Sequence, residues 1–288
     1  MSKRTRNRQL ARLASMRQAE RRRRQQRRRL ATISVALVVA LAGGGYAWAV
    51  FLRGDDEPAP TGPTGETGVT GPTGPTGEPG TRTGFVRPEP GPEEVACGAQ
   101  EPRDARRRKP QYNAPAQVVN PNRVYTATLT TSCGDIAIEL LADQAPETVN
   151  SYVFLARRGY FDGTRIHRID DAIDVIQGGD PTGTGTGGPG YTIPDELTGE
   201  ESYGPGTFAM ANGGPNTGGS QFFLITGDGG HNLDDQGAWT IFGSVIEGLD
   251  VAQTIQELEV QDPAAGLAGQ QPAQAIYIEE VTISTART

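Results

Sequence analysis

The stretch TFAMANGGPNTGGSQFFL, residues 207–224, decides how this chain is interpreted, together with RIHRIDDAIDVIQGGD, residues 165–180. The two segments can build one groove that contains a single arginine, Arg168. They have no cluster of metal ligands, no nucleophile paired with a base and no phosphate-holding lysine. Their composition therefore indicates chemistry that needs no covalent bond to the protein.

Charge is divided unevenly along the 288 residues. Residues 1–29 carry 13 Lys and Arg and one acid, so the remaining residues hold 14 basic and 33 acidic groups. A basic run of this kind either sets the topology of a neighbouring membrane span or binds nucleic acid or anionic lipid. Because the chain has neither zinc-ligand spacing nor an aromatic RNA-binding platform, we expect a basic cytoplasmic tail and no nucleic-acid partner.

A charge-free apolar run, LATISVALVVALAGGGYAWAVFL, follows the tail at residues 30–52. Its 23 residues are long enough to cross a hydrocarbon core of about 30 Å as a helix. The positive-inside rule then keeps the N-terminus in the cytoplasm and places everything after Arg53 outside, as in a single-pass protein of the cell membrane. The alternative is a cleaved signal peptide, because Ala47-Trp48-Ala49 has the small-x-small form of a cleavage site. The length of the apolar run favours the uncleaved anchor.

Residues 53–117 are predicted to be a disordered, extended linker. Glycine recurs at every third position from Gly62 to Gly80, which is a collagen-like repeat over residues 62–80. Such a repeat either assembles as a triple helix or serves as a stiff spacer, and six triplets favour the spacer because they give little cooperative length. The oligomeric state stays open.

The chain has two cysteines, Cys97 and Cys133. Both follow the predicted membrane span, and an exported compartment allows a disulfide to persist. They are either joined, which would tie the end of the linker to an early strand, or two unrelated thiols.

The globular domain is predicted at residues 118–288. Residues 124–140 alternate between apolar and polar residues around a Ser-Cys-Gly break, which predicts a β-hairpin. Residues 145–159 have the apolar spacing of a helix, and residues 275–283 alternate as a closing strand. Many short strands with few helices indicate a mainly β, closed and mostly antiparallel barrel.

Two competing kinds of site are excluded by the sequence. The glycine-rich run at residues 181–191 matches a dinucleotide-binding pattern, but Pro189 and Pro194 stand where its helix would run. His167 and His231 have no neighbours at metal-ligand spacing, so no metal site is expected.

Four segments in order resemble the cyclophilin family of peptidyl-prolyl cis/trans isomerases, over residues 124–283. They are DIAIELLADQAPETVNSYVFLARRGYFDGTRIHRI (135–169), VIQGGDPTGTGTGGPGY (175–191), FAMANGGPNTGGSQFFL (208–224) and WTIFG (239–243). The resemblance implies an eight-stranded antiparallel barrel with two capping helices, a site on its outer face and no cofactor. An anchor and linker ahead of the domain look like those of exported, membrane-anchored bacterial members.

The resemblance also implies the roles of the groove residues. Arg168 would be the catalytic donor to the prolyl nitrogen, a role that suits a permanent charge. The expected substrate contacts are backbone hydrogen bonds from Gln177 and Gln221, main-chain contacts from Asn212, a proline pocket of Ala211, Phe223 and Leu233, and support from His167.

The segment after Arg168 departs from the family pattern. Eight residues separate Arg168 from Gln177 where seven are usual, and the aromatic residue that usually floors the proline pocket is absent. Ile173 or Asp174 takes its place, and we expect Ile173 to point inward with Val175. Trp239 stands where a histidine is frequent and would restore some aromatic surface. Asn232 falls near a tryptophan that contacts cyclosporin in many relatives, so cyclosporin binding is expected to be weak.

These observations predict a membrane-tethered prolyl isomerase that binds proline-containing polypeptides and assists the folding of exported proteins. The alternative is a proline-peptide binding module at the cell envelope with little turnover, which the missing pocket aromatic favours. The set of Arg168, Gln177, Gln221 and Phe223 favours the isomerase.

Overall fold

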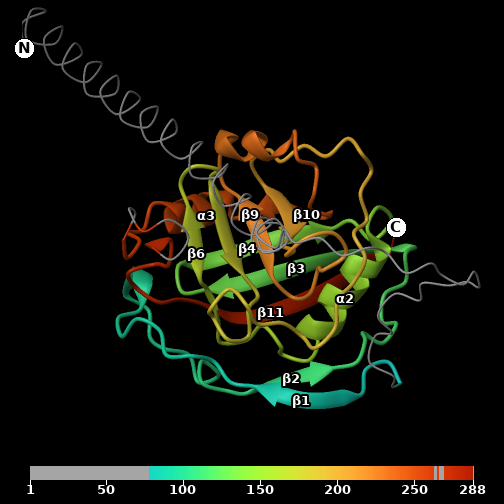
Figure 1. Cartoon of the computed structure of the whole chain (residues 1–288), viewed down its shortest axis with the longest axis horizontal. Coiled ribbons are helices and arrows are strands. Elements are labelled where there is room, and N and C mark those ends of the chain that lie inside the picture. Colours follow the sequence, from blue (N-terminus) through green and yellow to red (C-terminus); the bar gives the residue numbers. More distant parts are fainter. Residues whose placement is uncertain (1–77, 263–264, 266–268, 288) are drawn as a thin grey trace, which may run out of the picture. The chain divides into compact units, whose positions relative to one another are not determined.

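The computed structural model describes residues 78–262, 265 and 269–287. In these ranges the chain forms a nine-stranded sheet, a two-stranded sheet and two α-helices (Figure 1). The predicted tail, the apolar run at 30–52 and most of the Gly-x-y repeat lie outside them. Among the described residues, no helix combines the length and the apolar character that a membrane crossing requires.

The nine strands of the large sheet follow one another in space as β5, β11, β3, β4, β10, β8, β9, β7 and β6. All neighbouring pairs are antiparallel. The bounds in chain order are β3 Arg123–Thr131, β4 Gly134–Leu140, β5 Thr164–Ile166, β6 Arg168–Asp170, β7 Val175–Gly178, β8 Thr207–Met210, β9 Phe222–Ile225, β10 Ile241–Glu247 and β11 Ile276–Arg287.

The sheet closes into a barrel at His167. β5 and β6 stand at opposite ends of the strand order, yet only His167 separates them along the chain. Residues 164–170 thus pair first with β11 and then with β7. Our prediction of eight strands is wrong, since the sheet has nine: the closing segment is divided in two at His167.

The hairpin predicted at residues 124–140 is formed by β3 and β4, which pair in register from Tyr125 with Leu140 to Thr131 with Gly134. Residues of β3 alternate between buried and partly exposed, and the buried ones face the barrel interior. β11 lies on the other side of β3 and is the closing strand that the C-terminal alternation predicts.

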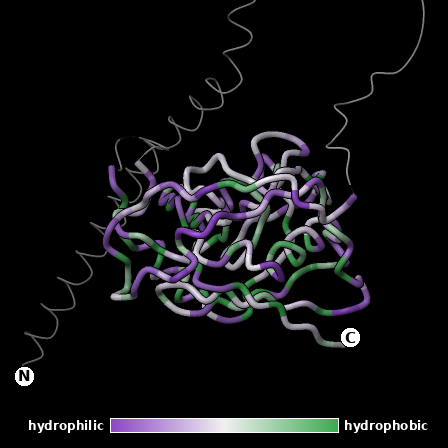
Figure 2. The backbone as a smooth tube through the Cα atoms, turned by 90° about the horizontal axis from the view of Figure 1, so that it is seen from below, coloured by the Kyte–Doolittle hydropathy of each residue, from purple (hydrophilic) through white to green (hydrophobic). Residues whose placement is uncertain are grey.

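Aromatic rings fill the core beneath the first helix, α2 (Pro146–Ala156). The ring of Tyr152 lies with its centroid between 4.9 and 5.8 Å from those of Phe161, Phe208, Phe222 and Phe242. Figure 2 shows hydrophobic stretches of backbone crossing the middle of the domain, with hydrophilic stretches mainly on the surrounding loops. This packed interior forces ligands to bind on the outer face of the barrel.

The two helices begin differently. α2 has no side-chain cap of its own, and the carboxylate of Glu196, from a distant loop, accepts the backbone N–H groups of Glu147 and Thr148 at 3.0 and 2.8 Å. A carboxylate there satisfies free N–H groups and complements the helix dipole. α3 (Leu249–Gln256) begins after Gly248, whose φ of +81° lies in the left-handed region.

Residues 78–117, here called the N-terminal strap, differ from the extended linker expected for residues 53–117. They contain the two-stranded sheet of β1 (Arg82–Val86) and β2 (Lys109–Tyr112) and a short 3-10 helix, η1 (Ala96–Gly98). Backbone hydrogen bonds join the strap to the domain, from Glu89 to Thr182, from Tyr112 to Pro189 and from Ala96 to Ala275. The strap is ordered by burial against the barrel, and this long-range packing leaves no periodic pattern in the strap sequence.

A disulfide joins Cys97 of the strap to Cys133 in the β3–β4 turn, with their Cα atoms 5.2 Å apart. Of the two alternatives for the cysteines, the structure has the bonded one. The bridge holds the strap to the hairpin at a point 36 residues away along the chain.

Candidate active site

Three neighbouring strands bring the central site residues into one row. Arg168 on β6 is directly opposite Gln177 on β7, and Gln177 is directly opposite Phe223 on β9. Ala209 on β8 continues the row next to Phe223. Directly opposed residues project from the same face of a sheet, so the antiparallel register alone places the arginine, an amide and an aromatic ring side by side.

This row opens into a pocket of about 210 Å³. Nine of the residues that the sequence analysis selected line it, namely Arg168, Ile173, Val175, Gln177, Ala211, Asn212, Phe223, Leu233 and Trp239. The remaining two, Gln221 and His167, lie outside the lining.

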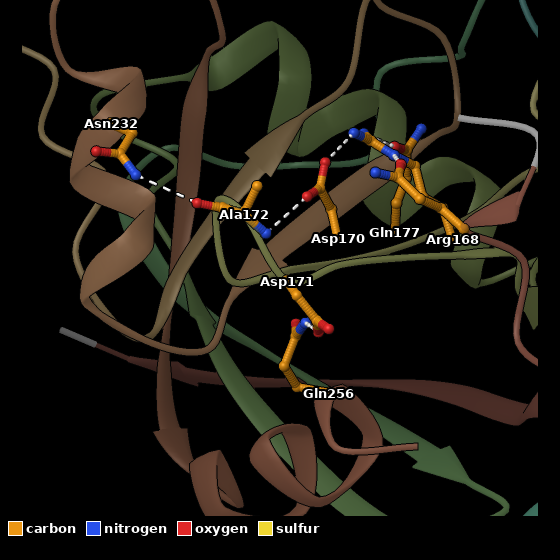
Figure 3. A network of polar contacts seen from close by, with 8 residues as sticks. Arg168, Asp170, Asp171, Ala172, Gln177, Asn232 and Gln256 are labelled. Atoms are coloured by element: carbon orange, nitrogen blue, oxygen red, sulfur yellow. Dashed lines mark hydrogen bonds and ion pairs between the residues drawn. The ribbon is translucent and has the colours of Figure 1, made fainter. Parts of the chain in front are cut away.

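The guanidinium of Arg168 forms one edge of the pocket and is bound through three of its nitrogens (Figure 3). Nη1 donates to Oε1 of Gln177 at 3.0 Å, and Nη2 donates to the carboxylate of Asp170 at 2.6 Å. Nε donates to Oε1 of Gln270 at 2.7 Å. The side chain keeps a quarter of its surface exposed, so a ligand in the pocket can reach it.

An amide chain continues from the arginine. Gln177 donates through Nε2 to the side-chain oxygen of Gln221 at 3.0 Å, and Gln221 donates in turn to the carbonyls of Gly185 and Gly187, each at 3.0 Å. Gln221 thus acts on the pocket through Gln177. A chain of hydrogen bonds that all run in the same direction polarises its members and restricts their rotation.

Asp180 shapes the glycine-rich loop that receives this chain. Its carboxylate accepts the backbone N–H groups of Thr182, Gly185 and Gly187 and the hydroxyl of Thr182. Burial pushes the pKa of Asp180 upward, but the hydrogen bonds from Thr182 and Gly187 outweigh burial and lower the pKa overall. The glycine-rich loop is therefore not a dinucleotide site; its Gly185 and Gly187 carbonyls hold the Gln221 side chain in place.

The opposite side of the pocket is apolar. Val175, Phe223 and Leu233 are buried there, with Ile173 and Trp239 partly buried against them. Phe223 and Trp239 meet edge to face, with ring centroids 6.0 Å apart. A small apolar ring fits such a surface.

Ile173, and not Asp174, occupies the floor position where the aromatic residue is absent. Asp174 has a φ of +48°, and its carboxylate accepts the N–H of Gly229 at 2.7 Å. Its carbonyl accepts the N–H of Thr226 at 2.8 Å. These bonds turn Asp174 toward the 226–229 segment and direct Ile173 into the pocket.

His167 does not line the pocket. It lies instead at a second, small pocket that Arg165, Gly183 and Pro272 also line. Its side chain is buried, and neither ring nitrogen reaches a partner with hydrogen-bonding geometry in the described part of the chain. Burial is the main cause that lowers its pKa, although Asp180 and the Arg165 backbone favour the charged ring. It lies where the barrel closes, between β5 and β6, and its predicted support of the groove stays a prediction.

Sequence reasoning missed three residues of the site. Asp170 stands two positions after Arg168 on the same strand, and this spacing was the available signal that their side chains share a face. Gln270 and Tyr203 reach the site from distant loops and give no local signal. Within the described ranges, no group of three or more His, Cys, Asp or Glu side chains is placed to hold a metal ion.

Comparisons with known proteins agree with this geometry. The family described as "Cyclophilin type peptidyl-prolyl cis-trans isomerase/CLD" matches residues 126–283. "Peptidyl-prolyl cis-trans isomerase A" of Mycobacterium tuberculosis is 39% identical over 181 residues, covering 57% of this chain and 95% of the relative. The human "Peptidyl-prolyl cis-trans isomerase-like 1" is 43% identical over 148 residues, covering 48% of this chain and 82% of the relative.

Solved structures give the same result. The crystal structure of a cyclophilin type peptidyl-prolyl cis-trans isomerase from Cryptosporidium parvum, in the presence of the dipeptide Ala-Pro, aligns with a TM-score of 0.50 and 32% identity. The alignment covers 56% of this chain and 99% of the other.

Proposed function

The chain belongs to the cyclophilin-type peptidyl-prolyl cis-trans isomerase family, and from this premise we propose that Arg168 catalyses rotation about X-Pro bonds as a hydrogen-bond donor to the prolyl nitrogen. The observation that carries the proposal is the pocket itself, where the guanidinium of Arg168 faces the apolar surface of Phe223 and Leu233. A proline ring on that surface brings its nitrogen toward the arginine.

The barrier to be lowered arises from amide resonance and amounts to about 18–20 kcal/mol. Twisting the bond localises a lone pair on the prolyl nitrogen, which a donor can then bind. Because the lone pair is delocalised into the carbonyl in both planar ground states, an N–H donor from Arg168 stabilises the twisted state selectively. The reaction makes no covalent bond to the protein and needs no proton transfer.

Polar groups on either side of the arginine would hold the peptide. Gln177, fixed by its bonds to Arg168 and Gln221, offers its amide to the substrate backbone. Asn212 is held by its donation to the carbonyl of Ala238 at 2.7 Å, which leaves its main chain at the pocket rim. The proposed substrate is therefore an extended segment with proline in the pocket.

The physiological clients that we propose are exported proteins. The charge-free run at 30–52 would anchor the chain with its N-terminus in the cytoplasm and its catalytic domain outside the membrane. The Cys97–Cys133 disulfide supports this location, because disulfides persist in oxidising compartments. Extraction of cell membranes with alkaline carbonate tests the anchor: release of the full chain into the soluble fraction would contradict it.

The isomerase is tested by measuring cis-to-trans isomerisation of a short Ala-Pro peptide with the full chain and its Arg168→Ala variant. Loss of a preorganised donor typically lowers kcat by a factor of about 10² to 10³, and we expect a loss in this range. Arg123→Ala, which removes an exposed arginine at the start of β3, is the matched control and should keep the parental rate. If the folded, unsubstituted protein binds the peptide but does not accelerate its isomerisation, the chain is instead a proline-peptide binding module.

A further inference from the structure

We propose that Asp170 is a positioning residue of this isomerase, which holds the guanidinium of Arg168 in the orientation needed for donation to the prolyl nitrogen. The proposal rests on the proposed role of Arg168. It starts from the 2.6 Å ion pair between Nη2 of Arg168 and the Asp170 carboxylate, whose side chain is only 7% exposed.

Asp170 completes a three-point attachment. The guanidinium has five N–H donors, and its bonds to Gln270, Gln177 and Asp170 engage one donor on each of its three nitrogens. One N–H on each terminal nitrogen is left for a ligand. With all three nitrogens held, the plane of the group is fixed, and the direction of the remaining donors is fixed with it.

Among these three acceptors, Asp170 is the charged one. A hydrogen bond between two ionised groups is shorter and stronger than one to a neutral amide, so Asp170 contributes most to the attachment. The side-chain oxygens of Gln177 and Gln270 then narrow the orientation of the guanidinium plane further.

The carboxylate can orient the arginine because it is itself immobile. Its second oxygen, Oδ1, accepts the N–H of Ala172 at 2.9 Å, and the flanking loop is tied down at two further points (Figure 3). Asp171 accepts the side-chain amide of Gln256 on α3 at 3.0 Å. The carbonyl of Ala172 accepts the amide of Asn232, on the 3-10 helix η2 (Asp228–Leu233), at 3.2 Å.

The alignment of the donor with the prolyl nitrogen matters for this reaction. The lone pair of the prolyl nitrogen is localised only in the twisted state and then points in one direction, so a donor displaced by about 1 Å can lose a factor of up to about 10² in rate. A free arginine side chain would spread its donors over many rotamers. The ion pair with Asp170 removes that freedom before the substrate binds, and so it should affect kcat more than KM.

The test compares kcat and KM for an Ala-Pro peptide in the full chain and its Asp170→Asn variant. Asparagine keeps the size of the side chain and one oxygen for the Ala172 N–H, but it removes the ionic acceptor. We expect kcat to fall about tenfold while KM stays within about twofold. Asp143→Asn, at an exposed carboxylate in the loop before α2 and away from the pocket, should leave both constants within about twofold.

A double-mutant cycle separates positioning from a general effect on the loop. If Asp170 acts through Arg168, the Asp170→Asn change should have no further effect on the residual rate of Arg168→Ala. An equal fold-loss in both backgrounds, or an unchanged kcat in the single variant, would overturn the positioning role while leaving the isomerase intact. If Asp170→Asn does not fold, Asp170→Ser keeps a hydroxyl for the Ala172 N–H and carries the same expectations. A parent without isomerase activity would overturn the proposed function and this role with it.

Discussion

Tyr203 and Trp239 hold each other through two reciprocal hydrogen bonds. The Tyr203 hydroxyl donates to the Trp239 carbonyl at 2.8 Å and accepts the Trp239 backbone N–H at 3.1 Å. Their rings meet edge to face, with centroids 5.9 Å apart. Burial is the main cause that raises the pKa of Tyr203 to about 12, so the hydroxyl stays protonated at neutral pH. One tyrosine thereby fixes both the backbone and the ring of the pocket tryptophan.

Replacing Tyr203 by phenylalanine should loosen the pocket. Two hydrogen bonds are lost and two backbone groups lose their partner, which should cost about 2 kcal/mol of unfolding free energy in urea denaturation. Peptide affinity should fall about threefold, because Trp239 is less well held. Tyr191→Phe is the control: it loses a buried hydroxyl contact with Ser151, at 2.8 Å, away from the pocket. If Tyr191→Phe weakened peptide binding as much, the specific role of Tyr203 would be refuted.

Breaking the Cys97–Cys133 bridge should destabilise the protein. The loop-entropy model gives about 4 kcal/mol for a loop of this length. The double variant Cys97→Ser/Cys133→Ser should therefore unfold at a lower denaturant concentration than the unsubstituted protein. Dithiothreitol should lower the unfolding midpoint of the unsubstituted protein toward that of the variant. Dithiothreitol should have no effect on the variant itself. Identical unfolding transitions for the oxidised and the reduced protein would show that the disulfide does not stabilise the fold.

Because Lys109 is buried, the free energy of unfolding should rise at alkaline pH. Its side chain is buried and donates to the Asp162 carbonyl, and desolvation is the main cause that lowers its pKa from 10.5 to about 8. Between about pH 8 and 10.5 the unfolded chain binds this proton and the folded chain does not, so unfolding free energy increases with pH in that window. The full effect is at most about 3 kcal/mol.

The measurement compares the parent with Lys109→Met by urea denaturation at pH 7 and pH 10. The difference between the two proteins isolates Lys109 from the tyrosines, which also begin to titrate near pH 10. The parent should gain stability relative to the variant as the pH rises. If the difference in unfolding free energy between the two proteins is the same at pH 7 and pH 10, Lys109 is not desolvated in the folded chain.

Substrate charge should influence turnover. From Ile169 to Ala286 the chain has no lysine or arginine and 18 acidic residues, and the charge of Arg168 is offset by Asp170. Peptides with lysine beside the Ala-Pro unit should therefore have a kcat/KM about fivefold above those with glutamate at low salt. This preference should shrink as salt screens the groove, since the Debye length falls to about 8 Å at physiological ionic strength. Equal rates for both peptides at low salt would contradict it.

Much of the site could be predicted because it is built from short strand segments. Arg168, Gln177 and Phe223 stand at fixed positions within motifs, and antiparallel pairing places directly opposed residues on one face. The inward direction of Ile173, in contrast, depends on a tertiary contact, because the Asp174 carboxylate turns away to accept the N–H of Gly229. The hairpin of β3 and β4 has a two-residue periodicity that needs no tertiary information.

Other features depend on contacts that no local pattern carries. The strap looks like a linker because it is poor in apolar periodicity, and its order comes from hydrogen bonds to the barrel and from the disulfide. The ninth strand appears because His167 divides the closing segment, and that break is imposed by closure of the barrel.

By itself, the sequence determined the family and most residues around the pocket, through four ordered segments that resemble the family, and it determined the barrel class, through the two-residue periodicity of short strands. Only the tertiary structure decided how Arg168 is held. Its Nε partner, Gln270, lies 102 positions away along the chain, and its ionic partner, Asp170, gains its role from a loop fixed between α3 and η2. Such contacts exist only when the barrel has closed and brought these segments together, because they depend on distance in space and not on separation along the chain.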